Sequence, residues 1–347
     1  MSDYWTLFAE DARTNGHAPL YARLAEGIRD DEELLAVAAK SRRGQPYANM
    51  ILAAAHYLLL RGARHPLRRF YANLNDGIRD EGADPFPQFR DFVLAHREEI
   101  EVLIATHATN TNEVGRSAIL HAGFRAVAAE AGTPLALIEI GPSAGLNMLW
   151  DRYRVRYRAG DAVYDVGPDD CGLVIECELR GGARPPVGET PAVASRVGLE
   201  RNPVDLSDAD QRDWLRALVW PDNVARFERL EKALAIRVAN PPEIHAGSAL
   251  DLLTDAIAQV PETSPICVYH TFVTYQFTEE MRETLDDLLT VAGLRRPVWR
   301  FSVEGRLGHD TPLQLYRYRD GTRDKRIFGR AHSHGGWLEW YADPVRA

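Results

Sequence analysis

"LIEIGPSAGLNML", residues 137–149, decides how the fold is interpreted. A short apolar run leads directly into Gly141-Pro-Ser143-Ala-Gly145, and Glu139 precedes the first glycine by two residues. Such a run is typical of a buried parallel strand, and small residues after it let a ligand approach the backbone at a helix start. The same five residues also fit the G-x-S-x-G turn in which a hydrolase serine is the nucleophile. The rest of the chain must separate these two interpretations.

Length and composition limit the possible domain number, binding partners and location of the protein. The chain has 347 residues, which favours two domains, and its net charge of −9 provides no basic surface for nucleic acid or an anionic membrane. Its three cysteines form no CxxC pair, so a disulfide framework or a zinc cluster is not expected. The N-terminus lacks the features of a signal peptide, and the longest apolar stretch is too short to span a bilayer. We therefore expect a cytoplasmic protein.

The pattern of apolar residues changes near Pro134. Residues 1–132 contain apolar positions at helical spacing and no convincing strand, and Gly132 is a plausible end for the last helix. Beyond it, short apolar runs alternate with helical segments, a pattern that favours a parallel α/β sheet. The prediction is an all-helical N-terminal domain, 1–132, followed by an α/β domain, 133–347.

The later elements are predicted from local signals. Thr278 is placed to cap a helix that ends at Gly293, and Asp320-Gly321 indicates a closing antiparallel hairpin. The stretch from Ala209 to Ile236 is predicted to be helical with a break at Pro221. The runs with strand-like composition are residues 195–203, 241–247, 264–273, 297–305 and 313–332.

One segment interrupts the alternation of strands and helices. Residues 154–184 resemble an antiparallel ribbon, which we interpret as an inserted β-lid beside the glycine loop. Arg152, Arg154, Arg156 and Arg158 alternate with Tyr153, Val155 and Tyr157. A half-solvated strand with outward arginines is the favoured explanation, and a cationic flap over an anionic substrate is the alternative.

The hydrolase interpretation fails a test of topology. A hydrolase serine turn follows several strands, and its oxyanion hole uses a loop after an earlier strand. Here residues 135–140 form the first predicted strand, and no HGGG-type loop precedes it. Later histidines leave a triad open, because the order of its members differs between folds. These histidines are His270, His309, His332 and His334. Ser143 is therefore predicted to line a ligand loop.

The cofactor interpretation requires an acid at the end of the second strand, about 20 residues past the loop. Glu200 lies 200 − 145 = 55 residues past Gly145, and removing the 31 residues of the insertion leaves 24. This spacing agrees with a nucleotide-binding α/β unit.

Several motifs now support a resemblance. Glu139-Ile-Gly141-Pro-Ser143-Ala-Gly145 resembles the first motif of class I S-adenosylmethionine-dependent methyltransferases, and GLERNP, with Glu200, resembles the second. IHAGSALDLL resembles the third, with Ser248 where that family has an aspartate for adenine. VYHTFVTY stands where the fourth motif falls. The resemblance implies a Rossmann sheet with a C-terminal antiparallel hairpin and S-adenosylmethionine as cofactor.

A second resemblance covers most of the chain. The combination TNEVGRS, EIGPSAGLNMLWDRY, DWLRALVWPD and HGGWLEW is similar to an uncharacterised bacterial family of unknown function. It implies a methyltransferase-like fold and no established activity.

Polar residues outside the motifs complete the candidate site. Asn112, Glu113 and Arg116 form either a helix cap with an ion pair or a polar cluster that faces the glycine loop and binds substrate. His270 and Glu304 follow buried strands, where α/β proteins place ligands, so either is a candidate proton acceptor. His332 and His334 share a strand face but lack a clear third ligand, and no metal is expected.

These observations lead to one functional expectation and two alternatives. We expect methyl transfer from S-adenosylmethionine to a small molecule, with Glu139, Gly141, Ser143, Gly145, Glu200 and Ser248 around the cofactor. The first alternative is a non-catalytic nucleotide- or metabolite-binding protein on the same fold. The second is a serine hydrolase that uses Ser143. The sequence predicts no nucleic-acid or membrane partner and leaves the oligomeric state open.

Overall fold

The computed structural model of the chain describes residues 2–14, 16–109, 112–305 and 310–346. The chain forms two compact units, of which unit 1 comprises residues 1–111 and 205–231 and unit 2 comprises residues 112–204 and 232–347. The units thus differ from the predicted division at residue 132. The segment 112–132 belongs to the unit with the sheet, and the segment 205–231 leaves that unit and joins the helices.

Unit 1 is helical, and its described residues contain no strand. Apolar side chains from all its main helices form one buried core, in which Trp5, Tyr21 and Phe92 are among the largest members. Its elements are α1 (Ser2–Thr14), α2 (Pro19–Arg29), α3 (Glu32–Ala38), α4 (Tyr47–Leu60), η1 (Pro66–Phe70), η2 (Ala72–Leu74), α5 (Phe86–Ala95), α6 (Arg97–Thr106), α8 (Ala209–Ala217) and the start of α9 (Val224–Ala239).

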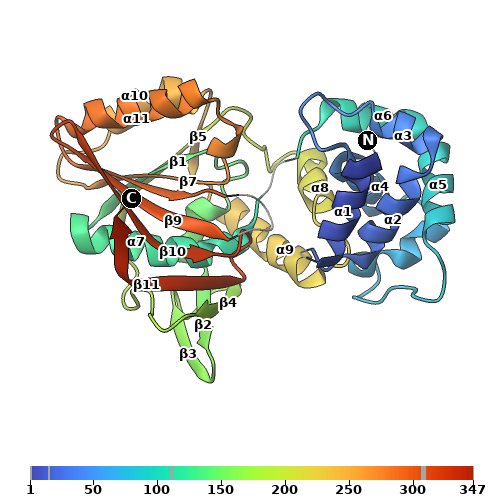
Figure 1. The fold of residues 1–347 in the computed structure, drawn as a ribbon, viewed down its shortest axis with the longest axis horizontal. Coiled ribbons are helices and arrows are strands. Elements are labelled where there is room, and N and C mark those ends of the chain that lie inside the picture. The colour runs from blue at the N-terminus through green and yellow to red at the C-terminus, as the bar shows by residue number, and fades with distance from the viewer. Residues whose placement is uncertain (1, 15, 110–111, 306–309, 347) are drawn as a thin grey trace. The chain divides into compact units, whose positions relative to one another are not determined.

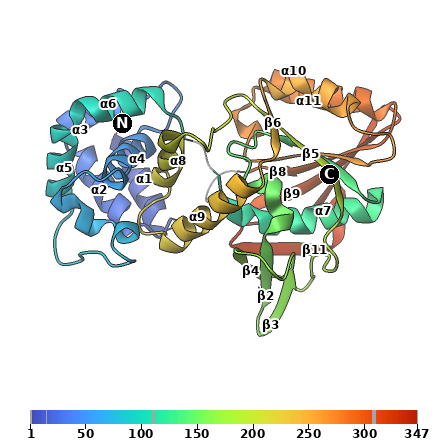
Figure 2. The same ribbon diagram turned by 180° about the vertical axis from the view of Figure 1, so that it is seen from behind.

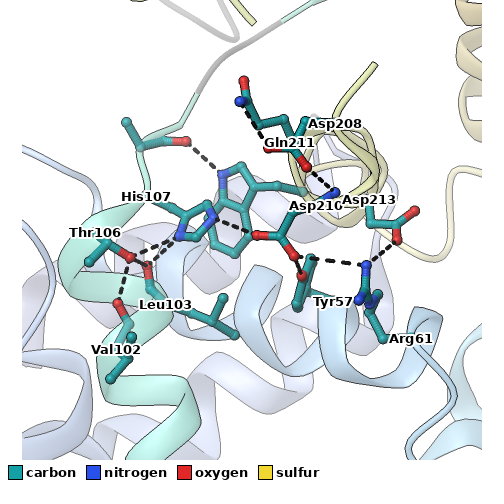
Figure 3. A network of polar contacts seen from close by, with 12 residues as sticks. Tyr57, Arg61, Val102, Leu103, Thr106, His107, Asp208, Asp210, Gln211 and Asp213 are labelled. Carbon is teal, nitrogen blue, oxygen red and sulfur yellow. Dashed lines mark hydrogen bonds and ion pairs between the residues drawn. The ribbon is translucent and has the colours of Figure 1, made fainter. Parts of the chain in front are cut away.

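Polar contacts bind α8 to the other helices of unit 1 (Figure 3). The Tyr57 hydroxyl on α4 donates to the Asp210 carboxylate on α8, and Arg61 pairs with Asp213 at 3.2 Å. The Trp214 indole N–H donates to the Ala108 carbonyl at 2.8 Å, and Trp214 is buried in the core. Because α8 shares this core, the chain leaves the sheet after residue 204 and returns only within α9.

Unit 2 contains a sheet of eleven strands among its described residues, in the order β3-β2-β4-β11-β10-β9-β8-β7-β1-β5-β6. Five neighbours, β6-β5-β1-β7-β8, are parallel. Counted along the chain without the insertion, their order is 3-2-1-4-5, which is the order found in doubly wound nucleotide-binding sheets. The strands are β1 (Leu135–Ile140), β2 (Arg154–Ala159), β3 (Ala162–Val166), β4 (Val174–Arg180), β5 (Val193–Glu200), β6 (Glu243–Ala246), β7 (Ile266–Thr271), β8 (Val298–Val303), β9 (Thr311–Arg319), β10 (Thr322–Ala331) and β11 (Trp337–Arg346).

Helices cover both faces of the parallel strands (Figure 1). The helices α10 (Ala249–Ala258) and α11 (Glu279–Gly293) pack on one face, where alternate residues of β1 and β7 enter the core. The helix α7 (Ser117–Ala131) packs on the other face, and its Phe124 ring lies 4.9 Å from the ring of Tyr269. Burial on both faces explains why these strands appear in the sequence as continuous apolar runs.

The C-terminal antiparallel part is larger than the predicted hairpin. The strands β9, β10 and β11 form a three-stranded meander that joins the parallel strands through β8 and β9. The predicted turn is confirmed at its tip, where Asp320 and Gly321 both have positive φ, of 51° and 73°. The strand β11 was missing from the prediction.

The inserted segment was predicted to be an antiparallel ribbon that forms a β-lid beside the glycine loop, and the antiparallel pairing is wrong in part. The strands β2 and β3 do form an antiparallel hairpin, visible in Figure 2, but β4 is parallel to β2 and also pairs with β11. The insertion therefore extends the main sheet at the edge opposite to β6. Its Tyr157 hydroxyl donates to the Ala118 carbonyl, so this edge packs on α7.

The arginines of β2 are neutralised by neighbouring strands. Arg156 forms two bonds of 2.9 Å with Asp165 on β3, and Arg158 lies 2.7 Å from Glu176 on β4. Arg154 also pairs with Asp165, at 3.2 Å. These pairs agree with the favoured explanation, a half-solvated strand, and leave the cationic flap without support.

Candidate functional site

The candidate site lies at the carboxyl ends of the parallel strands. From β1 the chain continues to β5 and β6 on one side and then crosses to β7 and β8 on the other. In open α/β sheets this switch point leaves a crevice outside the strand ends, where ligands bind. The loop 141–145 follows β1 there, and His270 is the penultimate residue of β7.

In the glycine loop, residues 141–145, every second residue has a left-handed backbone conformation. Gly141, Ser143 and Gly145 have φ of 68°, 54° and 73°. A Cβ on Gly141 would lie 2.7 Å from a methyl group of Val273, and one on Gly145 would lie 3.0 Å from Ile244. Both glycines are therefore required by conformation and by space. The short helix η4 (Asn147–Arg152) follows the loop.

Ser143 is held on both its backbone and its side chain. Its hydroxyl accepts from Nδ2 of Asn112 at 2.7 Å, and its N–H donates to Oε2 of Glu200 at 2.8 Å. The N–H of Ala144 donates to Oδ1 of Asn112 at 3.1 Å. The Asn112 amide thus holds the turn from one direction and the Glu200 carboxylate from another.

Glu200 ends β5 and stands against the glycine loop, as the spacing argument requires. Besides the bond from Ser143, its Oε1 accepts the N–H of Asn202 at 3.0 Å. Each carboxylate oxygen retains a further lone pair, so the side chain can still accept from a ligand. Ser248 follows β6 as the N-cap residue of α10, and no side-chain capping bond is formed there.

Glu139 lies on the strand that leads into the loop, and its side chain is buried. Its Oε2 accepts from the Tyr269 hydroxyl at 2.9 Å. The pKa of Glu139 is raised to about 8, mainly because the side chain is buried. The hydrogen bond from Tyr269 and the positive charge of Arg116 lower this pKa, and the negative charge of Glu200 raises it. The carboxyl group therefore carries a proton for much of the time near neutral pH.

His270 and Glu304 form a buried pair at the ends of β7 and β8. Nδ1 of His270 lies 2.7 Å from Oε1 of Glu304, which also accepts the N–H groups of Val273 and Thr274 at 2.8 and 3.1 Å. Burial raises the pKa of Glu304, but the bonds from His270 and the amides outweigh it and leave that pKa below its ordinary value. Because an ionised carboxylate only accepts, Nδ1 carries the hydrogen. Among the described residues, the buried Nε2 of His270 has no hydrogen-bond partner.

The segment 112–116 joins the separate parts of the site. Glu113 caps the 3-10 turn η3 (Val114–Arg116) by accepting the Gly115 N–H. Nε of Arg116 donates to the Ser333 carbonyl at 2.8 Å, and its guanidinium lies 4.3 Å from the centre of the Phe272 ring. Glu113 and Arg116 are each only 1% exposed. Asn112 therefore faces the loop, whereas the two charged side chains form part of the framework.

Two residues of the site were not singled out from the sequence, although Phe272 lies inside the stretch VYHTFVTY. Phe272 has a φ of 56°, a conformation that is strained for a bulky side chain and is concentrated at functional sites. Arg237, on the part of α9 in unit 2, donates through Nε to the Ala144 carbonyl at 2.9 Å. Arg237 lies 237 − 145 = 92 residues after Gly145 in the sequence. It therefore reaches the glycine loop only in the folded chain.

The remaining histidines form no site of their own within the described residues. The rings of His332 and His334 pack edge to face at 5.5 Å, and His309 lies outside the described residues. Across the described ranges, no three side chains of the metal-binding types gather into a cluster. In the same ranges, no helix has the length and apolar character needed to cross a membrane.

The chain is a mixed α/β protein with a large, mostly parallel sheet, and a glycine-rich loop follows β1 at the carboxyl edge of the parallel strands. The chain belongs to the family described as "Uncharacterized protein conserved in bacteria (DUF2332)", whose model matches residues 5–340. This confirms the resemblance to an uncharacterised bacterial family. Neither the comparison with curated proteins nor that with solved structures found a significant match.

Proposed function

We propose that the chain is an S-adenosylmethionine-dependent methyltransferase that acts on a small molecule. The observation that carries the proposal is the glycine loop with Glu200 beside it, in a sheet of order 3-2-1-4-5. The residues fit the cofactor, because Glu200 stands against the glycine loop and retains acceptor capacity for ribose hydroxyls. Ser248 stands where the class I methyltransferases that the chain resembles have an aspartate for adenine, so this chain lacks that contact.

The chain's own residues would supply alignment and one proton transfer. When bound, S-adenosylmethionine supplies an electrophilic methyl group. His270 would take the proton of a hydroxyl or amine acceptor at Nε2, and Glu304 would hold the opposite ring nitrogen as Nδ1–H. With four donors around its carboxylate, Glu304 is a positioning residue in this scheme. His270 is 2% exposed, so entry of the acceptor requires a local rearrangement.

Calorimetric titration with S-adenosylmethionine and S-adenosylhomocysteine tests the cofactor assignment. We expect binding by the wild type and at least a tenfold loss in Glu200→Ala. Glu243→Ala, which removes an exposed acid from the neighbouring strand, is the matched control and should bind normally. No binding at millimolar ligand would overturn the proposal. Binding without methyl transfer to any acceptor would favour the non-catalytic metabolite-binding alternative.

One observation favours a second candidate, the serine hydrolase. The φ of 54° at Ser143 matches the strained strand-to-helix turn of a nucleophilic serine, and unit 2 also contains the His270–Glu304 pair. Among the described residues, however, Nε2 of His270 has no hydrogen-bond partner, so it does not hydrogen-bond to Ser143 in this conformation. A fluorophosphonate probe that labels the wild type and spares Ser143→Ala would support hydrolysis over methyl transfer.

A further inference from the structure

Two carboxyl side chains point to the same face of the sheet beside the glycine loop. Glu139 of β1 is in register with Gly198 of β5, and Glu200 lies two residues further along β5, where a side chain again points to that face. Among the described residues, neither carboxyl group forms an ion pair, because Glu139 accepts from the Tyr269 hydroxyl and Glu200 accepts from backbone N–H groups. The hydrogen-bond donors to the two acids in that part of the chain are therefore neutral.

The charged groups on the elements around Glu139 are directed to other partners. Arg196 of β5 forms two bonds of 2.7 Å with Asp151. Arg116 of η3 donates to backbone carbonyl groups, and so does Arg237 of α9. Within the described part of the chain, Glu139 thus has no counter-ion in contact with it. The other titratable side chains on these elements bond to one another or to backbone carbonyl groups, and they are Cys267 of β7, Tyr153 after η4, and His121 and Arg125 of α7.

Glu139 keeps a proton in this setting. Burial is the main cause that raises its pKa to about 8, the Tyr269 hydrogen bond and the charge of Arg116 lower that pKa, and the charge of Glu200 raises it. The charge of Glu200 thus reaches Glu139, and so does the charge of a group that lies beside Glu200. A cation at that position favours the ionised form of Glu139, whereas a neutral group leaves the proton in place.

We propose that Glu139 gives up its proton when a positively charged ligand binds at the glycine loop, so that the site couples the binding of a cation to the release of a proton. The inference rests on the proposed function, in which the cation is the sulfonium of S-adenosylmethionine. The O–H bond of Glu139 breaks, the proton passes to the buffer, and the carboxylate stays beside the ligand. S-adenosylhomocysteine has the same amino and carboxyl groups but a neutral sulfur, so Glu139 should remain protonated beside it. By linkage, the affinity for S-adenosylmethionine should rise with pH, by up to about tenfold per unit below the pKa of Glu139.

Calorimetric titrations of the full chain at pH 6.5, in phosphate and in imidazole buffer, count the protons released. The binding enthalpy contains the ionisation enthalpy of the buffer multiplied by the number of protons exchanged, so the difference between the two buffers gives that number. We expect S-adenosylmethionine to release more than about half a proton and S-adenosylhomocysteine less than about 0.2. In infrared difference spectra of the wild type, the carbonyl band of a protonated carboxylic acid should disappear with the first ligand and persist with the second.

Two variants assign the released proton. Glu139→Gln keeps an acceptor for the Tyr269 hydroxyl and has no proton to release, so its binding of S-adenosylmethionine should exchange less than about 0.2 proton. Glu243→Gln, at an exposed acid of β6, is the matched control and should release as much as the wild type.

Three results would overturn the inference and leave the proposed function standing. They are binding of S-adenosylmethionine without proton release, equal release with both ligands, and release that persists in Glu139→Gln. Failure of both ligands to bind is a different result, which overturns the proposed function and this inference together. The comparison of the two ligands on the wild type gives an answer even where Glu139→Gln does not fold.

Discussion

The carboxylate of Glu304 accepts a hydrogen bond from Nδ1 of His270 at 2.7 Å and, at the same time, the N–H groups of Val273, Thr274 and Tyr275. One side chain therefore fixes both the imidazole and the segment that follows β7. The segment starts at Phe272, whose backbone is left-handed. A strained residue persists only where its surroundings hold it, and the bonds to Glu304 do so here.

Replacing Glu304 with glutamine should destabilise the sheet-containing unit. The glutamine amide group directs N–H donors toward backbone N–H groups that need acceptors, so we expect a loss of about 2 kcal/mol in the free energy of unfolding. Urea denaturation followed by circular dichroism measures it. Glu283→Gln, at an exposed position of α11, should change stability by less than about 0.5 kcal/mol. Equal effects of the two substitutions would contradict the role given to Glu304.

The tautomer of His270 follows from the same geometry. Because Glu304 accepts at Nδ1, the neutral ring should carry its hydrogen there and leave Nε2 as the unprotonated nitrogen. Two-bond ¹⁵N–¹H correlation spectra of histidine-labelled protein distinguish the two tautomers, and His270→Gln assigns the signal. In Glu304→Gln the preference for the Nδ1–H form should weaken. An Nε2–H tautomer in the wild type would remove the basis for proton transfer to Nε2.

Gly141 provides a test of the glycine loop that is independent of any charge. In Gly141→Ala, the new methyl group meets Val273 at 2.7 Å and the residue must hold a φ of 68°. We expect a loss of about 1–3 kcal/mol and weaker binding of S-adenosylmethionine. Gly160→Ala is the matched control, since its φ is 58° and nothing lies within 4 Å of the added carbon. The excess loss at Gly141 measures the steric contact alone.

The parallel strands could be predicted because each one is buried on both faces. β1 and β7 are apolar runs, and the spacing from Gly145 brought Glu200 to the loop once the insertion was removed. Local signals were reliable where one residue determines the structure. Thr278 caps α11 by accepting the Met281 N–H, and Gly132, at a φ of 84°, ends α7.

The features that the sequence could not predict depend on distant contacts. The strand β11 has mostly exposed residues over its second half, so its composition is weakly strand-like, and pairing with β10 and β4 forms it. The helix α8 joins unit 1 because its Trp214 enters that core. Arg237 reaches the glycine loop through tertiary structure alone, which a local pattern does not record, and the residue type of Phe272 does not indicate its left-handed backbone.

His121 should make unit 2 sensitive to acid. Burial, and then the charge of Arg125, lower the pKa of His121 to about 4, from 6.5 in an unfolded chain. Its contribution to stability is therefore complete above pH 6.5 and is lost as the pH falls toward 4, because the unfolded chain binds the proton first. The free energy of unfolding, measured from pH 7 to 4.5, should fall more steeply in the wild type than in His121→Asn. Equal slopes would show that His121 does not titrate in this way.

Glu139 should have the opposite effect over the upper part of the pH range. Its pKa is about 8 in the folded chain and 4.5 when unfolded, so the folded state retains a proton that the unfolded state releases. Stability from this group is then complete below pH 4.5 and declines as the pH rises to about 8, by up to a few kcal/mol at about 1.4 kcal/mol per pKa unit. Glu139→Gln keeps an acceptor for the Tyr269 hydroxyl and cannot ionise. Relative to the wild type, this variant should be similar near pH 4.5 and more stable at pH 8.5, whereas the exposed-site control Glu283→Gln should show no such crossover. A constant difference between wild type and Glu139→Gln across this range would mean that Glu139 is already ionised in the folded chain.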